Sequence, residues 1–166
     1  MTSHNWKQFI KRIPVRSSTQ AIFKAWSTQE GLESWFLKLA EFKTPNGILR
    51  NRNEPIQKGD RYKWLWFGYD DSVAEENEIV FSNETDELQF IFSGECIVKV
   101  RVKEEAGEII CELEQTMPME DETEQRYFFI ECGKGWTFYL TNLKSILEGG
   151  PDLRNKNNEI HNVINA

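Results

Sequence analysis

The chain has 166 residues, of which 39% are hydrophobic and 28% charged, and its formal net charge is −7. This length fits one globular domain with an ordinary core and excludes two large domains. An acidic pI near 5.0 disfavours nucleic acid as a partner, because a surface that binds phosphates is basic. Aromatic residues make up 13% of the chain, which exceeds the need of a minimal core.

The first predicted elements are a strand and two short helices. Residues 6–15 are expected to form the strand, since apolar and polar residues mix there and a proline lies near its end. Capping-box patterns at 17–20 and 27–30 then place the helix starts at Ser17 and Ser27. The sequence therefore predicts two consecutive short helices.

A long loop and a series of strands follow. Proline, glycine and polar residues over 38–60 predict a loop with a brief strand near 40–43, and loops of this length often lie over a functional opening. From residue 61 onward, apolar residues alternate with a period of two, which predicts strands over 61–67, 78–82, 88–92, 96–103 and 109–117. Together with the first segment, these strands would form an antiparallel meander of six or more.

The last predicted element is a helix over 123–148, whose apolar positions recur at three- and four-residue steps. These positions are Phe129, Cys132, Trp136, Leu140, Leu143 and Leu147. Gly133 and Gly135 lie inside the helix, where each costs about 1 kcal/mol relative to Ala, so we expect a kink or close packing there. We expect one domain over residues 1–150 and a polar tail over 151–166, whose last part, 155–166, is frayed or loosely docked.

This order of elements favours an α+β fold in which a curved antiparallel sheet wraps around the long helix. Such a sheet hides the apolar stripe of the helix and the inward aromatic rows together. It also leaves a wedge of space where helix and sheet diverge, which is the default place for a small-molecule site.

Five segments carry a resemblance to a known family. They are IPV at 13–15, IFKAW at 22–26, LESWF at 32–36, GDRYKW at 59–64 and GWTFYLTNL at 135–143. Their order and spacing resemble the helix-grip superfamily (START-like, Bet v-like, SRPBCC) over residues 6–150. More narrowly, they resemble bacterial homologues of the C-terminal domain of the activator of the heat-shock-protein-90 ATPase. Asp60 stands where the family usually has the second glycine of a turn.

The resemblance implies a curved antiparallel sheet that grips a long C-terminal helix, with two short helices closing one end. Members of the superfamily bind lipids, sterols, plant hormones or polyketides, and a few are cyclases. The heat-shock activator domain instead works by contacting a chaperone.

In-phase aromatic rows carry the ligand-binding hypothesis, because such side chains would give a cavity large, stiff and apolar walls. The candidate cavity residues are Trp35, Phe36, Trp64, Trp66, Phe81, Phe90, Phe92, Leu113, Gln115, Trp136 and Tyr139. The alternative is that these side chains fill the space between helix and sheet. Gln115 either orients a ligand carbonyl or hydroxyl or is a satisfied core amide.

We expect no metal site, cofactor or catalytic residue. The only histidines, His4 and His161, lie near opposite ends of the sequence, and three cysteines without ligand spacing indicate reduced core thiols. Glu112 and Glu114 are out of phase with the inward row of their strand, so both are expected to face water.

The leading hypothesis is therefore non-catalytic binding of a small hydrophobic or amphipathic molecule, lipid-like or polyketide-like, between the last helix and the sheet. One alternative is a co-chaperone-like module that stimulates a heat-shock-protein-90-type ATPase. The nine acidic residues over 104–125, with no basic one, are either its docking face or a solvated rim. A second alternative is a cyclase-like enzyme with a buried acid.

The sequence also leads to expectations about the cellular location of the protein and about its oligomeric state. No leader pattern and no run of 18 apolar residues is present, so we expect a cytoplasmic protein without a membrane span. An apolar edge over residues 64–69 leaves a homodimer open as an alternative to burial of that edge.

Overall fold

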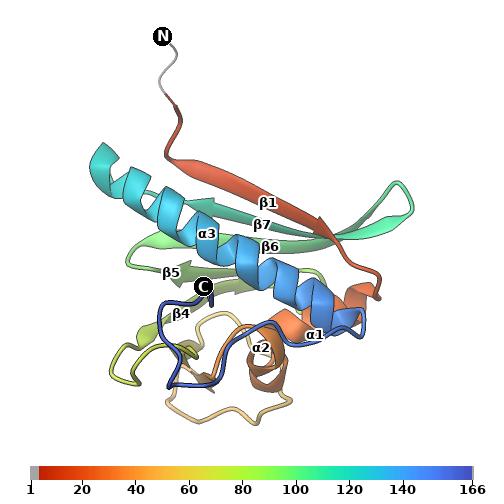
Figure 1. Ribbon diagram of the computed structural model, residues 1–166. Helices are drawn as coiled ribbons and strands as arrows, with labels where there is room; N and C mark the ends of the chain where they lie inside the picture. Colours follow the sequence, from red (N-terminus) through yellow and green to blue (C-terminus); the bar gives the residue numbers. More distant parts are fainter. Residues whose placement is uncertain (1–3, 166) are drawn as a thin grey trace.

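Seven antiparallel strands and three helices make up the computed structural model, which describes residues 4–165 (Figure 1). The strands are β1 Gln8–Pro14, β2 Leu39–Lys43, β3 Arg61–Leu65, β4 Glu75–Ser82, β5 Glu87–Phe92, β6 Cys96–Glu105 and β7 Glu108–Thr116. The helices are α1 Thr19–Ser27, α2 Gln29–Trp35 and α3 Glu122–Leu147. The α+β class, the two short helices after the first strand and the long C-terminal helix are confirmed.

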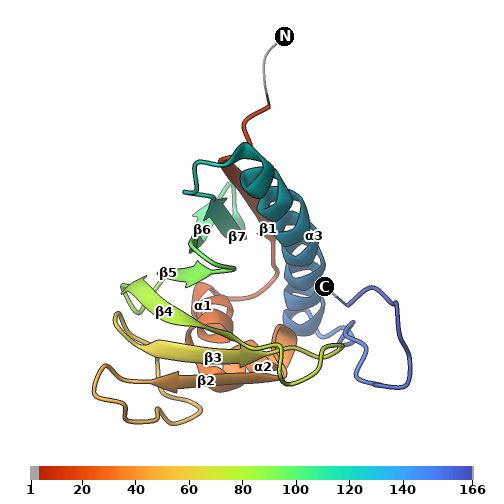
Figure 2. The ribbon, with the colours of Figure 1, turned by 90° about the vertical axis from the view of Figure 1, so that its left-hand side faces the viewer.

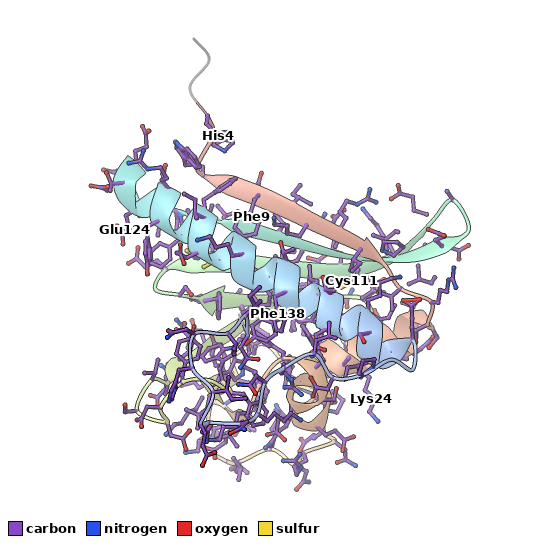
Figure 3. The ribbon with its side chains drawn as sticks, viewed as in Figure 1. His4, Phe9, Lys24, Cys111, Glu124 and Phe138 are labelled. Atoms are coloured by element: carbon purple, nitrogen blue, oxygen red, sulfur yellow. The ribbon has the colours of Figure 1, made fainter. Side chains whose placement is uncertain are left out.

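The strands form one sheet in the order β1-β7-β6-β5-β4-β3-β2. Figure 2 shows that the sheet curves from β1, which lies beside α3, to β2 and β3, which lie under α1 and α2. Phe9 lies on β1 beside α3 (Figure 3). Its ring contacts that of Phe129 on α3, with centroids 5.4 Å apart. The curved sheet thus packs against the long helix, which is the predicted helix-grip arrangement.

Side-chain caps start the two short helices one residue later than predicted. The Ser18 hydroxyl accepts a hydrogen bond from the Ala21 N–H, and the Thr28 hydroxyl accepts one from the Gly31 N–H, each at 3.0 Å. Ser27 is the last residue of α1, so it cannot cap the next helix. The capping-box pattern located both helix starts but not the residue that caps them.

A bulge in β4 overturns one predicted site residue. The register pairs Ile79 with Phe90, but Phe81 with Gln89, because one extra residue lies between the two pairs. Phe81 is therefore on the opposite face from Ile79 and is 39% exposed. Its assignment to the cavity, which assumed unbroken alternation from Ile79, is wrong.

The C-terminal segment, residues 151–165, is attached to the domain at two buried residues, of which Asn165 lies in the part expected to be frayed or loosely docked. The Arg154 guanidinium donates hydrogen bonds of 3.0–3.1 Å to the carbonyls of Glu33, Ser34 and Leu37, at the end of α2. The Asn165 side chain donates to the Phe67 carbonyl at 3.0 Å. The segment therefore connects α2 to the loop between β3 and β4.

No helix within residues 4–165 is both long enough and apolar enough to cross a membrane.

Candidate ligand-binding cavity

A cavity of about 340 Å³ lies beside α3, at the end of the aromatic core. Its aromatic lining consists of Phe36, Trp66, Tyr69, Phe92, Tyr127, Phe128, Trp136 and Tyr139, and its other lining residues are Val73, Glu75, Ser93, Glu131, Cys132, Lys134 and Gly135. Lining residues at its rim, such as Tyr69 and Tyr127, are 52% and 61% exposed, so the cavity is open to solvent. Its volume and apolar walls are typical of small-molecule sites.

One face of α3 forms a wall of the cavity. Phe128, Cys132, Gly135 and Tyr139 recur at four-, three- and four-residue steps, which places them on the same side of a helix. A Cβ atom added at Gly135 would meet no other atom within 4 Å. This glycine therefore widens the cavity, whereas the sequence had suggested a kink or close packing.

Five of the predicted cavity residues do line the cavity. They are Phe36, Trp66, Phe92, Trp136 and Tyr139. They come from the end of α2, where Phe36 is the C-cap, from the segment after β3, from β5 and from α3. Ring centroids of Phe36 and Phe92 lie 5.1 and 5.2 Å from that of Trp136, so these walls support one another.

The other predicted aromatic residues on the inner face fill the core behind the cavity. Trp35, Trp64 and Phe90 are at most 1% exposed and do not line the cavity. Trp64 stacks on Tyr62 at a centroid distance of 3.9 Å and meets Phe90 at 5.2 Å. Three of the predicted aromatic residues therefore fill space in the core, and five surround the cavity.

Leu113 and Gln115 on β7 are also fully buried outside the cavity lining. The Gln115 side-chain oxygen accepts a hydrogen bond of 2.8 Å from the Trp136 indole N–H. Gln115 is thus a satisfied core amide, one of the two alternatives left open by the sequence. It fixes the orientation of Trp136, which does line the cavity.

Glu75 is the cavity residue that sequence reasoning missed. It is the first residue of β4 and pairs with Trp64, so its side chain shares the inner face. Its carboxylate accepts a 2.8 Å hydrogen bond from the Ser93 N–H. Burial raises the pKa of Glu75, and the bonds from Ser93 and Asn77 offset only part of that rise. Alternation counted back from Ile79 would have found it, but the strand was expected to begin at Glu78.

Glu112 and Glu114 lie on the outer face of the sheet, but Glu112 is not simply solvated. It is 8% exposed, and its carboxylate lies 3.0 Å from both the Arg12 and Lys103 side-chain nitrogens and 3.4 Å from that of Arg101. These cations lie on the two neighbouring strands. The acidic character of this region is therefore partly neutralised within the sheet.

The apolar edge at residues 64–69 is mostly covered within the chain. Trp64 and Leu65 are buried. The Arg154 guanidinium and the Lys156 ammonium lie 5.3 and 5.1 Å from the centroid of the Phe67 ring. A homodimer through this edge stays a prediction.

A larger hollow of about 680 Å³ lies between the β3–β4 loop and the C-terminal segment. Its lining includes four asparagines and two aspartates of these two segments, with few apolar side chains. Tyr69 lines both hollows. Because apolar burial drives the binding of hydrophobic ligands, the cavity beside α3 is the better candidate site.

Comparisons with solved structures find the same fold in several bacterial proteins. SSP2350 from Staphylococcus saprophyticus matches with a TM-score of 0.68 and 16% identity, over 89% of this chain and 96% of its own. The Aha1 dimer from Colwellia psychrerythraea matches at 0.64 and 15%, over 86% and 97%. DynU16, a putative protein in the dynemicin biosynthetic locus, matches at 0.65 and 17%, over 90% of this chain and 50% of its own.

A comparison with curated proteins finds no match. The family model described as "Activator of Hsp90 ATPase homolog 1-like protein" matches residues 16–148, a range that includes β2 to β7, all three helices and the wall residues of the cavity. With most of the sequence covered in this way, the chain belongs to the Activator of Hsp90 ATPase homolog 1-like family.

Proposed function

We propose that the protein binds a small hydrophobic or amphipathic molecule, lipid-like or polyketide-like, in the cavity beside α3, without converting it chemically. The observation that carries this proposal is the cavity of about 340 Å³ with mainly aromatic walls. Removing apolar surface from water contributes roughly 25 cal/mol per Å², and stiff aromatic walls lose little entropy on binding. A structural relative in the dynemicin biosynthetic locus supports including polyketide-like molecules among the candidates.

Gly135 allows a direct test because it is the one cavity position where a side chain can be added without displacing protein atoms within 4 Å. The Gly135→Leu variant should bind the neutral probe Nile red at least about tenfold more weakly, since the new side chain occupies the cavity and removes apolar contact. Dye fluorescence and the emission of Trp66 and Trp136, which line the cavity, report binding.

Gly133→Ala is the matched control. Gly133 is in the same helix, and an added Cβ would make only ordinary contact with Lys11, at 3.9 Å. The Gly133→Ala variant gains about 1 kcal/mol of helix propensity, as an alanine at position 135 would. Position 133, however, lies outside the cavity lining. Equal binding of Nile red by Gly135→Leu and by the unchanged protein would place the probe elsewhere and contradict the proposal.

The co-chaperone alternative draws on the family description, but the arrangement of acidic residues favours it less. The acidic residues of the stretch 104–125 are spread over the β6–β7 turn, β7 and the start of α3, and the turn and the helix start lie at opposite ends of the sheet (Figure 1). One of its members, Glu112, is also paired with three cations. The alternative requires raised ATPase turnover of a heat-shock-protein-90-type chaperone at saturating protein.

The cyclase alternative now has a named acid, because Glu75 lies in the cavity lining. Burial also raises the pKa of the neighbouring Cys132 thiol, which keeps that thiol protonated and a poor nucleophile. An enzyme of this kind would therefore depend on proton transfer through Glu75.

A further inference from the structure

Two carboxylates, Glu75 and Glu131, lie in the wall of a cavity that is otherwise mainly aromatic. The Glu131 side chain is 50% exposed and already pairs with Lys134, so Glu75 is the lining carboxylate that needs an explanation. Its position follows from strand register, since pairing with Trp64 places it on the inner face. The adjacent Glu76 lies on the other face and is exposed. Only one of two neighbouring glutamates thus points toward the cavity.

The charge of Glu75 has no cationic partner among the residues that the structure describes. It takes part in none of the ion pairs formed within residues 4–165, and its hydrogen bond from Ser93 involves a neutral backbone N–H. Lys134, which also lines the cavity, lies 2.9 Å from the Glu131 carboxylate instead. A partly buried carboxylate without a counter-charge is costly to maintain, and burial accordingly raises its pKa.

A ligand can supply the missing positive charge. An ammonium group would satisfy the free lone pairs of the carboxylate with a charge-assisted hydrogen bond, and the faces of surrounding aromatic rings also attract cations. Resting on the function proposed above, we propose that the ligand is a hydrophobic amine whose ammonium group lies at Glu75 and whose apolar body lies against Trp66, Phe92 and Trp136. An alcohol would supply only an uncharged hydrogen-bond donor, and a ligand with a carboxylate would be repelled by the charge of Glu75.

The test uses three probes with the same eight-carbon chain: octylamine, octanol and octanoate. Binding is measured at neutral pH by calorimetry and tryptophan emission. The unchanged protein should bind octylamine about tenfold or more tightly than octanol, because the attraction between opposite charges is strong at short range in a partly buried site, and octanoate should bind most weakly. Rising salt should weaken octylamine binding but not octanol binding.

Glu75→Gln removes the charge but keeps an oxygen that can accept from Ser93. This variant should lose the preference for octylamine while its affinity for octanol changes by less than about twofold, as expected for an uncharged apolar contact. Glu76→Gln is the matched control, with the same change in net charge on the exposed face of the strand, and should behave as the unchanged protein does.

Equal affinity of the unchanged protein for octylamine and octanol would overturn this inference, as would a preference for octylamine that survives in Glu75→Gln. Neither result affects the proposed function, since octanol still binds in the cavity. Failure of the proposed function is distinct: neither Nile red nor octanol binds, or both bind Gly135→Leu unchanged. The comparison of the three probes on the unchanged protein needs no variant and does not depend on the folding of Glu75→Gln.

Discussion

At the scale of single residues, Asp60 stands where the family resemblance leads one to expect a glycine, and its side chain makes several hydrogen bonds there. Asp60 is fully buried and pairs with the Arg50 guanidinium, with one hydrogen bond of 2.9 Å, and it also accepts one of 2.8 Å from the Gln57 N–H. These bonds hold the long loop that precedes β3. Asp60 therefore anchors this loop to its own last turn and to Arg50.

Asp60→Gly, which restores the usual glycine, should lower the free energy of unfolding by about 3 kcal/mol, because it leaves the mostly buried Arg50 without its main partner. Urea denaturation followed by tryptophan emission measures this loss. Asp60→Asn keeps an acceptor for the Gln57 N–H and should lose less. A variant as stable as the unchanged protein would show that the Arg50 pair contributes no net stability.

At the scale of elements, β1, β7 and β6 share an ion-pair cluster on the outer face of the sheet, centred on Glu112. Burial by itself would raise the pKa of Glu112, but Lys103, Arg12 and Arg101 together lower it below its ordinary value of 4.5. Cross-strand charge pairs of this kind stabilise neighbouring strands.

This cluster predicts a pH dependence of stability. Because the native pKa of Glu112 lies below the unfolded value, the unfolded state binds the proton more readily. The contribution of Glu112 is therefore complete above pH 4.5 and is lost as the pH falls through the lower native value. Glu112→Gln should unfold at lower urea concentration at pH 7 and should lose less stability than the unchanged protein between pH 5 and 3, an interval that roughly brackets this titration.

Glu108→Gln is the control for this experiment, since Glu108 is exposed on the same strand and belongs to none of the ion pairs within residues 4–165. Its denaturation should follow that of the unchanged protein at every pH. If Glu112→Gln gave the same pH profile as Glu108→Gln, the cluster would contribute nothing to the acid sensitivity of the fold.

At the scale of the whole molecule, the C-terminal segment connects parts that are far apart in the sequence. Arg154 binds carbonyls at the end of α2 and lies over Phe67, and Asn165 binds the carbonyl of Phe67. The loop that follows Phe67 supplies Tyr69 and Val73 to the cavity rim. The segment therefore helps to position one side of the proposed site.

Arg154→Ala should lower the free energy of unfolding by about 3 kcal/mol, because it leaves the helix carbonyls and the Asp152 carboxylate without their buried partner. Amide hydrogen exchange over residues 66–74 should also accelerate. Lys156→Ala is the control, since Lys156 pairs with the same Asp152 but its side chain is 51% exposed. Unchanged exchange in Arg154→Ala would mean that the rim loop is held independently of the segment.

The sequence by itself determined the order and type of the elements and the family fold. Period-two alternation predicted most of the strands, and the stripe from Phe129 to Leu147 predicted α3, because these periodicities depend only on local backbone geometry. The capping patterns likewise located both short helices to within one residue, since a cap acts within a single turn.

Tertiary structure alone decided which aromatic side chains fill the core and which surround a cavity. Trp64 and Trp66 follow the same alternation, yet only Trp66 lines the cavity, because the curvature of the sheet and the position of α3 set which rings meet. A bulge in β4 placed Phe81 on the outer face of the sheet, and the start of β4 at Glu75 placed that residue on the inner face. These outcomes depend on contacts between residues far apart in the chain, which a local pattern does not encode.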